Sequence, residues 1–212
     1  DLEKTLTELA AKLEIERTNA ARRLEQVVNQ MLGAVGFKNA VFRIEIARTS
    51  GEMPFSDETV GLTASGFNVV RFLVSANVGS PLRPLEEVAS GGEISRILLA
   101  VKAALAEKMS LPLLIFDEID TGVGGETALK VGRMLEALAQ GHQLLVVTHL
   151  PQIASRNGVH FYVYKETREG RTTSRIVRLE GENRAAHIAK MMSGAETPSD
   201  AALRSAKELI AG

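Results

Sequence analysis

Two carboxylates follow directly on a continuous apolar run, where they could hold a metal ion and activate a water molecule. The run is Leu113-Leu114-Ile115-Phe116, after Pro112, and Asp117 and Glu118 end it. Such a run is typical of a strand covered on both faces in a parallel sheet, and ligands bind at the carboxyl edge of these sheets. Asp117 suits a water-mediated Mg²⁺ contact, and Glu118 suits the polarisation of an attacking water. The alternative is that the two residues only begin the next helix, whose dipole favours acidic side chains.

A second motif, Ser90-Gly91-Gly92-Glu93, could bind an anion. Two glycines at a helix start expose backbone amides, and Ser90, placed as the N-cap, adds a hydroxyl group. The alternative is a capped helix start without a ligand. A phosphate-binding loop of the usual kind requires a Gly-Lys step, and no Gly in the chain is followed by Lys. These motifs therefore supply parts of a nucleotide site without its phosphate cradle.

The segment after Pro112 is predicted to be a strand-helix-strand unit. Ala128, Val131, Leu135 and Leu138 follow helical spacing, and a second buried strand over 144–147 ends at Thr148-His149. This arrangement predicts a parallel, right-handed unit. A lone His is more often structural than functional, but its place at the end of a buried strand favours a function.

The order of these elements resembles the second half of an ABC-type ATPase head. The resemblance implies a signature motif at Ser90, Gly91, Gly92 and Glu93, which would bind nucleotide in trans, and a Walker B pair at Asp117 and Glu118. It further implies that Asp120 lies in the D-loop. His149, which stands 31 residues after Glu118 (149 − 118), would be the switch histidine that reaches the γ-phosphate.

The longer sequences of three segments, 88–96, 116–125 and 147–154, resemble those of the RecN family. This family consists of SMC-like bacterial proteins of recombinational double-strand-break repair. The resemblance covers essentially the whole chain. It implies an α/β fold: the C-terminal lobe of a P-loop ABC-type ATPase head, with parallel strands, a signature helix and the root of a coiled-coil arm. Residues 1–36 would be the returning arm helix, and residues 37–212 the C-terminal part of the head, which lacks the Walker A half.

The function implied by this resemblance is ATP-dependent head engagement with hydrolysis at a composite site. ATP and Mg²⁺ would be required, and the partners would be the N-terminal half of the same head, a second head and DNA, in the cytoplasm at the nucleoid. We expect the chain to be part of a longer polypeptide, and alone to neither bind ATP tightly nor hydrolyse it. We expect the N-terminal half of the head to cover the apolar run at 113–116, so the isolated chain should expose an apolar sheet edge or face.

The remaining elements are predicted from periodicity. Residues 2–31 carry apolar side chains at three- and four-residue steps, which fits a coiled-coil seam and an amphipathic core helix about equally; the resemblance favours the arm. Residues 41–47 and 67–76 alternate like a pair of antiparallel strands joined by a loop. A hairpin is expected over 161–166 and 172–179, and helices over 91–109, 184–192 and 199–210. Four arginines of the hairpin could contact DNA phosphates, but a solvated hairpin is favoured because two glutamates stand nearby.

Composition fits a soluble intracellular protein, and the resemblance implies no membrane partner. The 212 residues carry a net charge of −1 and no Cys, which excludes disulfides and thiolate metal sites, and no apolar run is long enough to span a membrane. This charge balance neither supports nor excludes DNA binding. Two alternatives remain: the nucleotide-binding domain of an ABC transporter, against which the leading heptad-like helix argues, and a purely structural scaffold.

Overall fold

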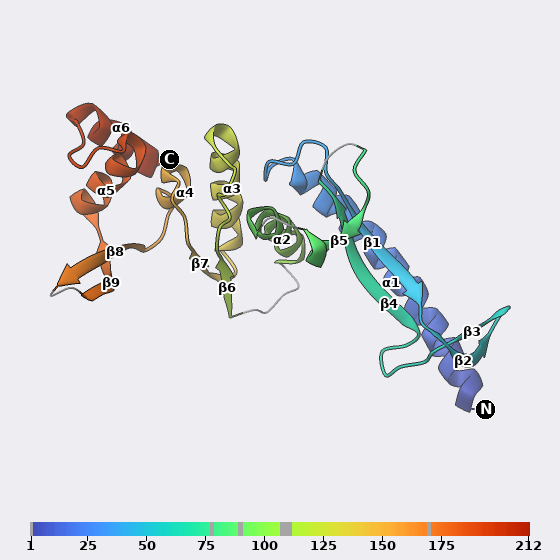
Figure 1. Cartoon of the computed structure of the whole chain (residues 1–212). Helices are drawn as coiled ribbons and strands as arrows, with labels where there is room; N and C mark the ends of the chain where they lie inside the picture. The colour runs from blue at the N-terminus through green and yellow to red at the C-terminus, as the bar shows by residue number, and fades with distance from the viewer. Residues whose placement is uncertain (1, 77–78, 89–90, 107–111, 169–170) are drawn as a thin grey trace. The chain divides into compact units, whose positions relative to one another are not determined.

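The computed structural model describes residues 2–76, 79–88, 91–106, 112–168 and 171–212. The fold is α/β and divides into two compact units, Asp1–Lys108 and Met109–Gly212 (Figure 1). In the described part of the chain, no helix combines the length and the apolarity needed to cross a membrane.

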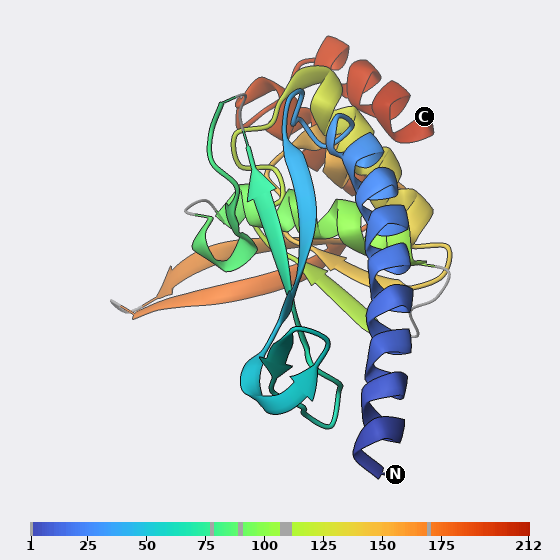
Figure 2. The same ribbon diagram turned by 90° about the vertical axis from the view of Figure 1, so that its right-hand side faces the viewer.

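The first unit is built on an antiparallel sheet. Strand β4 (Asn68–Ser75) lies between β1 (Val41–Arg48) and the short β5 (Arg83–Pro84), and the predicted pairing of the two long strands is confirmed. Helix α1 (Leu2–Leu32) runs alongside β1 and β4 in both views (Figures 1 and 2). The 3₁₀ turn η1 (Leu85–Glu87) leads towards helix α2 (Gly91–Leu105), which also contacts α1.

Side chains of α1 satisfy the open edge of strand β1. The amide of Asn29 donates to the Phe42 carbonyl at 2.9 Å and accepts from the Phe42 N–H at 2.8 Å. One turn earlier, the Glu25 carboxylate accepts from the Ile44 N–H at 2.6 Å. An edge strand exposes unpaired backbone groups, and proteins commonly cover them. The helix is therefore bonded to the backbone of the strand as well as packed against its side chains.

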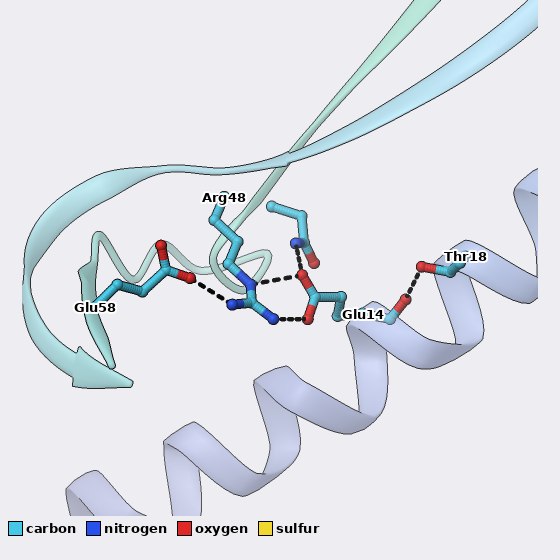
Figure 3. Close-up of polar contacts among 5 residues, drawn as sticks. Glu14, Thr18, Arg48 and Glu58 are labelled. Carbon is cyan, nitrogen blue, oxygen red and sulfur yellow. Dashed lines mark hydrogen bonds and ion pairs between the residues drawn. The ribbon is translucent and has the colours of Figure 1, made fainter. Parts of the chain in front are cut away.

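A guanidinium–carboxylate pair fixes the N-terminal half of α1 to the same sheet (Figure 3). Arg48 donates to both oxygens of Glu14, through Nε at 2.9 Å and Nη2 at 2.7 Å, and Asn68 donates to Glu14 at 2.9 Å. Arg48 also pairs with Glu58 and covers the ring of Phe55 at 4.6 Å. The hydrogen bonds from Arg48 lower the pKa of Glu14, because they stabilise its charged form. Bidentate pairs of this kind give orientation as well as energy.

The segment predicted as a loop between β1 and β4 is instead a small hairpin, so this prediction was wrong. Strands β2 (Ser50–Phe55) and β3 (Glu58–Val60) pair antiparallel, with an irregular register between Ser50 and Met53. A Cβ atom on Gly51 would lie 2.3 Å from the Cα of Gly61, so the close backbone approach requires glycine. Gly51 and Gly61, which contributed to the prediction of a loop, permit this irregular pairing.

Helix α1 carries two stripes, and only one of them is buried. Ala10, Ala21, Val28 and Leu32 are buried in the unit, which confirms an amphipathic core helix. The residues of the predicted seam are largely exposed, among them Leu2, Leu6, Leu9, Leu13, Ala20 and Val27. The single helix is confirmed, whereas the arm and the domain boundary at residue 36 stay predictions.

The second unit begins with the predicted strand-helix-strand element, which is confirmed. Strands β6 (Leu113–Phe116) and β7 (Gln143–Val146) are parallel neighbours, and helix α3 (Gly125–Leu138) connects them. The short helix α4 (Pro151–Ala154), which was not predicted, follows β7 with Pro151 in its first turn. Proline is favoured there because the missing N–H has no helical partner in any case.

One face of the β6–β7 sheet is apolar and exposed, as predicted. Side chains alternate along a strand, and Leu114 and Phe116 point to the buried face. On the other face, Leu113, Ile115, Leu145 and Val147 are 44%, 57%, 49% and 54% exposed. A contiguous apolar patch of this kind marks an interaction surface more often than chance exposure.

The end of the chain forms the predicted hairpin and two helices. Strands β8 (His160–Arg168) and β9 (Arg171–Leu179) pair antiparallel, and helices α5 (Gly181–Ser193) and α6 (Asp200–Ala211) pack on each other through Ile188, Ala189 and Ala206. On the hairpin, Arg168 and Arg175 pair with Glu166, and Arg178 pairs with Glu180. These ion pairs agree with the favoured interpretation of a solvated hairpin.

Candidate functional site

The predicted acidic pair and the predicted histidine follow two neighbouring parallel strands. Phe116 lies opposite Val146, and the Val147 N–H donates to the Phe116 carbonyl at 2.9 Å. Asp117-Glu118 and Thr148-His149 therefore leave the sheet at the same edge. Carboxyl ends of parallel strands are the usual place for ligands in open α/β sheets.

The chain reverses sharply at Glu118, which has a positive φ of 55°. The Asp117 carboxylate accepts from the Glu118 N–H at 2.9 Å, and the Thr121 N–H donates to the Glu118 carbonyl at 3.2 Å, which closes the turn. A non-glycine residue in this conformation costs about 1–2 kcal/mol. Such strain is found where a side chain must point in a particular direction, as in ligand sites. Both acidic side chains are exposed to solvent.

Asp120 is buried, with 2% of its surface exposed, and it bonds to the segment that follows β7. Its Oδ2 atom accepts from the Thr148 hydroxyl at 2.6 Å, from the His149 N–H at 2.7 Å and from the Leu150 N–H at 3.3 Å. The Nδ1 atom of His149 lies 3.0 Å from the same oxygen, although the imidazole is 72% exposed. One carboxylate oxygen therefore joins the turn after β6 to the turn after β7.

The structure brings together four of the eight predicted site residues, namely Asp117, Glu118, Asp120 and His149. Of the signature motif, Ser90 lies outside the described residues. Gly91, Gly92 and Glu93 form the first turn of α2, as predicted, and belong to the other unit. Sequence reasoning missed Thr148, whose signal was its place between a buried strand and a candidate histidine.

Magnesium fits these residues only together with a phosphate ligand. Among the residues that the structure describes, no group of three or more His, Cys, Asp or Glu side chains could hold a metal ion. Mg²⁺ commonly takes one or two carboxylates and completes its shell with water and substrate phosphates. Asp117, exposed at the strand end, suits that mode of binding.

A pair of histidines joins the hairpin to α5 in the same unit. The Nε2 atom of His160 lies 3.0 Å from the Nδ1 atom of His187, and the ring of Tyr162 packs on His187 at 4.4 Å. Burial lowers the pKa of His160 and that of His187, with nearby Arg184 adding to the first shift and His160 and Lys190 to the second. Both rings are therefore neutral at pH 7, which lets one donate to the other.

This pair predicts acid sensitivity of the second unit. Because both folded pKa values lie below the unfolded value of about 6.5, the unfolded chain binds more protons as the pH falls. The stabilisation is fully present above about pH 6.5 and is lost as the pH falls through the folded pKa values. Urea unfolding of His187→Gln, followed by circular dichroism between pH 7 and pH 5, should show a flatter pH dependence than the wild type. Equal slopes in the two proteins would contradict this assignment.

The chain is 37% identical over 209 residues to the DNA repair protein RecN of Vibrio cholerae, which covers 99% of this chain and 36% of the relative. It is 36% identical over 206 residues to the DNA repair protein RecN of Bacillus subtilis, covering 95% of this chain and 36% of the relative. Among solved structures, it is similar in fold to the Smc head domain with a coiled coil and joint of Pyrococcus yayanosii. The TM-score is 0.54 and the identity 19%, over 84% of this chain and 30% of that chain. A comparison with models of protein families gives no match.

Proposed function

Since the chain belongs to the RecN family, as a segment that spans 36% of the length of the relatives reported above, we propose that it is the C-terminal portion of an SMC-like ATPase head. In this proposal the complete protein acts in DNA double-strand-break repair by recombination. ATP joins two heads, and its hydrolysis at a composite site releases them. The α/β fold, which is that of Smc heads, supports the proposal.

The observation that carries the proposal is the common edge at which β6 and β7 end. Asp117 and Glu118 follow β6 at this edge, and His149 follows β7. In our assignment, Asp117 holds Mg²⁺ through water, Glu118 polarises the attacking water, and His149 contacts the γ-phosphate. The metal ion, when bound with ATP, neutralises charge that develops on the phosphates. The protein residues orient water and phosphate, which is most of what phosphoryl transfer requires of a protein.

The first turn of α2 is assigned to the nucleotide of the partner head. Gly91 and Gly92 lie at a helix N-terminus, where the dipole favours phosphate, with Gly91 exposed and Gly92 buried, and Ser90 and Glu93 complete the motif. A site completed only by a second head makes hydrolysis depend on head engagement. Asp120 is assigned to the D-loop between the two sites.

The exposed seam of α1 is assigned to the arm. Leu2, Leu6, Leu9 and Leu13 alternate at four- and three-residue steps and are all exposed, whereas the neighbouring stripe of the helix packs on the first unit. An apolar heptad stripe in water is stabilised by a partner helix. We therefore assign residues 1–36 to the returning arm helix and residues 37–212 to the head.

The exposed apolar face of β6 and β7 is assigned to the N-terminal half of the same head, which would also supply the phosphate cradle. Parallel strands are normally covered on both faces. The four exposed apolar residues of this face match that expectation. DNA is the proposed effector of the complete protein, by analogy with the repair function in the names of the relatives.

ATPase assays on the chain alone and on the complete protein test this proposal. The chain alone should neither bind a fluorescent ATP analogue tightly nor hydrolyse ATP, whereas the complete protein should do both. Its ATPase rate should rise with DNA, and this stimulation should weaken with salt, because phosphate contacts release counterions. A complete protein without ATPase activity would contradict the enzymatic assignment, and copurification with a membrane subunit would favour a transporter.

A further inference from the structure

The turn after β7 is organised around a single buried oxygen. The Oδ2 atom of Asp120 lies within hydrogen-bond distance of four groups from three consecutive residues: the Thr148 hydroxyl, the His149 N–H and imidazole, and the Leu150 N–H. The Leu150 N–H also lies 3.1 Å from the Thr148 hydroxyl, which closes the turn on itself. Successive backbone N–H groups that converge in this way form a concave site for an anion.

The position of one proton follows from these contacts. Oδ2 accepts from the Thr148 hydroxyl and from two backbone N–H groups, which is the pattern of an ionised carboxylate, a group that can only accept. The contact of 3.0 Å between Oδ2 and the Nδ1 atom of His149 is then a hydrogen bond only if Nδ1 is the donor. The proton therefore lies on Nδ1, and the lone pair of the neutral ring lies on Nε2.

We propose that Asp120 is a positioning residue that fixes the Nδ1–H tautomer of His149 and presents its Nε2 atom to the ligand. Free imidazole side chains favour the opposite tautomer, with the proton on Nε2, so the buried carboxylate reverses the intrinsic preference. With Nδ1 anchored, the exposed part of the ring can accept a proton or a hydrogen bond at Nε2, and can donate from it only after gaining a proton. The last step, in which the ligand is a nucleotide phosphate, rests on the function proposed above.

The contacts of Asp120 also couple His149 to the turn that carries Glu118. Asp120 stands two residues after Glu118, and its carbonyl accepts from the Val123 N–H at 3.1 Å within the turn that follows β6. A displacement of this turn therefore moves the carboxylate on which the His149 imidazole and backbone depend. The histidine and the turn that carries Glu118 are mechanically joined.

Nitrogen-15 NMR of the histidine rings in this chain, at a pH above about 8 where imidazole is neutral, tests the inference without any need for ATPase activity. The protonated ring nitrogen is distinguished from the bare one by its chemical shift, and the His149→Gln spectrum assigns the signals. The wild type should show His149 with its proton on Nδ1. Asp120→Ala should return His149 to a mixture dominated by Nε2–H, whereas Thr148→Val, which removes a donor to the carboxylate and leaves the imidazole contact, should retain the Nδ1–H form.

An Nε2–H tautomer in the wild type would overturn the inference, whether or not Asp120→Ala folds. An unchanged tautomer in a folded Asp120→Ala protein would also overturn it. In the complete protein, Asp120→Asn should lower kcat about 10–100-fold, as the loss of supporting residues does elsewhere, and should change the pH profile. If the Nδ1–H form is found but His149→Ala hydrolyses ATP normally, the positioning role of Asp120 stands and the assignment of His149 to the nucleotide falls.

Discussion

Glu118→Gln in the complete protein is expected to slow ATP hydrolysis by about 10²–10⁴-fold, or roughly 3–5 kcal/mol of barrier, and to leave nucleotide binding intact. Glutamine keeps the size of the side chain and its ability to accept one hydrogen bond. It removes the negative charge that polarises the attacking water. Single-turnover hydrolysis and equilibrium binding of a fluorescent ATP analogue, measured on the same preparation, separate the two effects.

The matched control for this variant is Glu182→Gln. Glu182 lies at the exposed start of α5 and pairs with Lys207 at 2.7 Å, so its substitution removes the same charge away from the strand ends. Hydrolysis by the control should equal that of the wild type. Near-normal turnover in Glu118→Gln would refute the assignment of this residue. Loss of nucleotide binding together with turnover would instead give it a role in holding the ligand.

Ile115→Glu is expected to leave the stability of the chain alone almost unchanged and to destabilise the complete protein. In the chain alone the side chain is 57% exposed, so the free energy of unfolding should change by no more than about 0.5 kcal/mol. If the N-terminal half covers this face, the same substitution buries an unpaired carboxylate there, at a cost of about 3–5 kcal/mol. Urea titration of both proteins measures this difference directly.

Ala201→Glu, on the exposed side of α6, serves as the control for Ile115→Glu. It introduces the same charge in the same unit, and it should be tolerated in both proteins. If Ile115→Glu is equally harmless in the complete protein, the apolar face of β6 and β7 stays open there, and the other half of the head covers a different surface. The comparison therefore tests the proposed partner of this face without any reference to catalysis.

Strong periodicity made most of the fold predictable. The 31-residue helix α1 and the hairpin β8–β9 each have a pattern long enough to exclude other structures. The strands β6 and β7 have only four residues each, and their parallel pairing was predictable because a helical pattern separates the two apolar runs. The β2–β3 hairpin could not be predicted, because it depends on the contact between Gly51 and Gly61, ten residues apart, and on an irregular register. Helix α4 has only four residues, which is too short for a pattern.

The candidate site was predictable in its members and not in its connections. Neighbouring parallel strands made it expected that Glu118 and His149 would share an edge of the sheet. The sequence could not show that the carboxylate of Asp120 is buried and bonded to Thr148, His149 and Leu150, because nothing in residue type or spacing tells which way a carboxylate points after a strand. Likewise, the positive φ of Glu118 is a tertiary effect, since local preference disfavours it.

The bonds between α1 and strand β1 determine how a force on the helix would be passed on. Asn29 and Glu25 are hydrogen-bonded to the backbone of β1, and Glu14 accepts from the Arg48 side chain at the far end of the same strand. Slippage of the helix by one residue, about 1.5 Å, would break all of these bonds at once. A pull or a twist applied at the N-terminal end of α1 is therefore transmitted to the sheet, because the helix is hydrogen-bonded to β1 from Glu14 to Asn29.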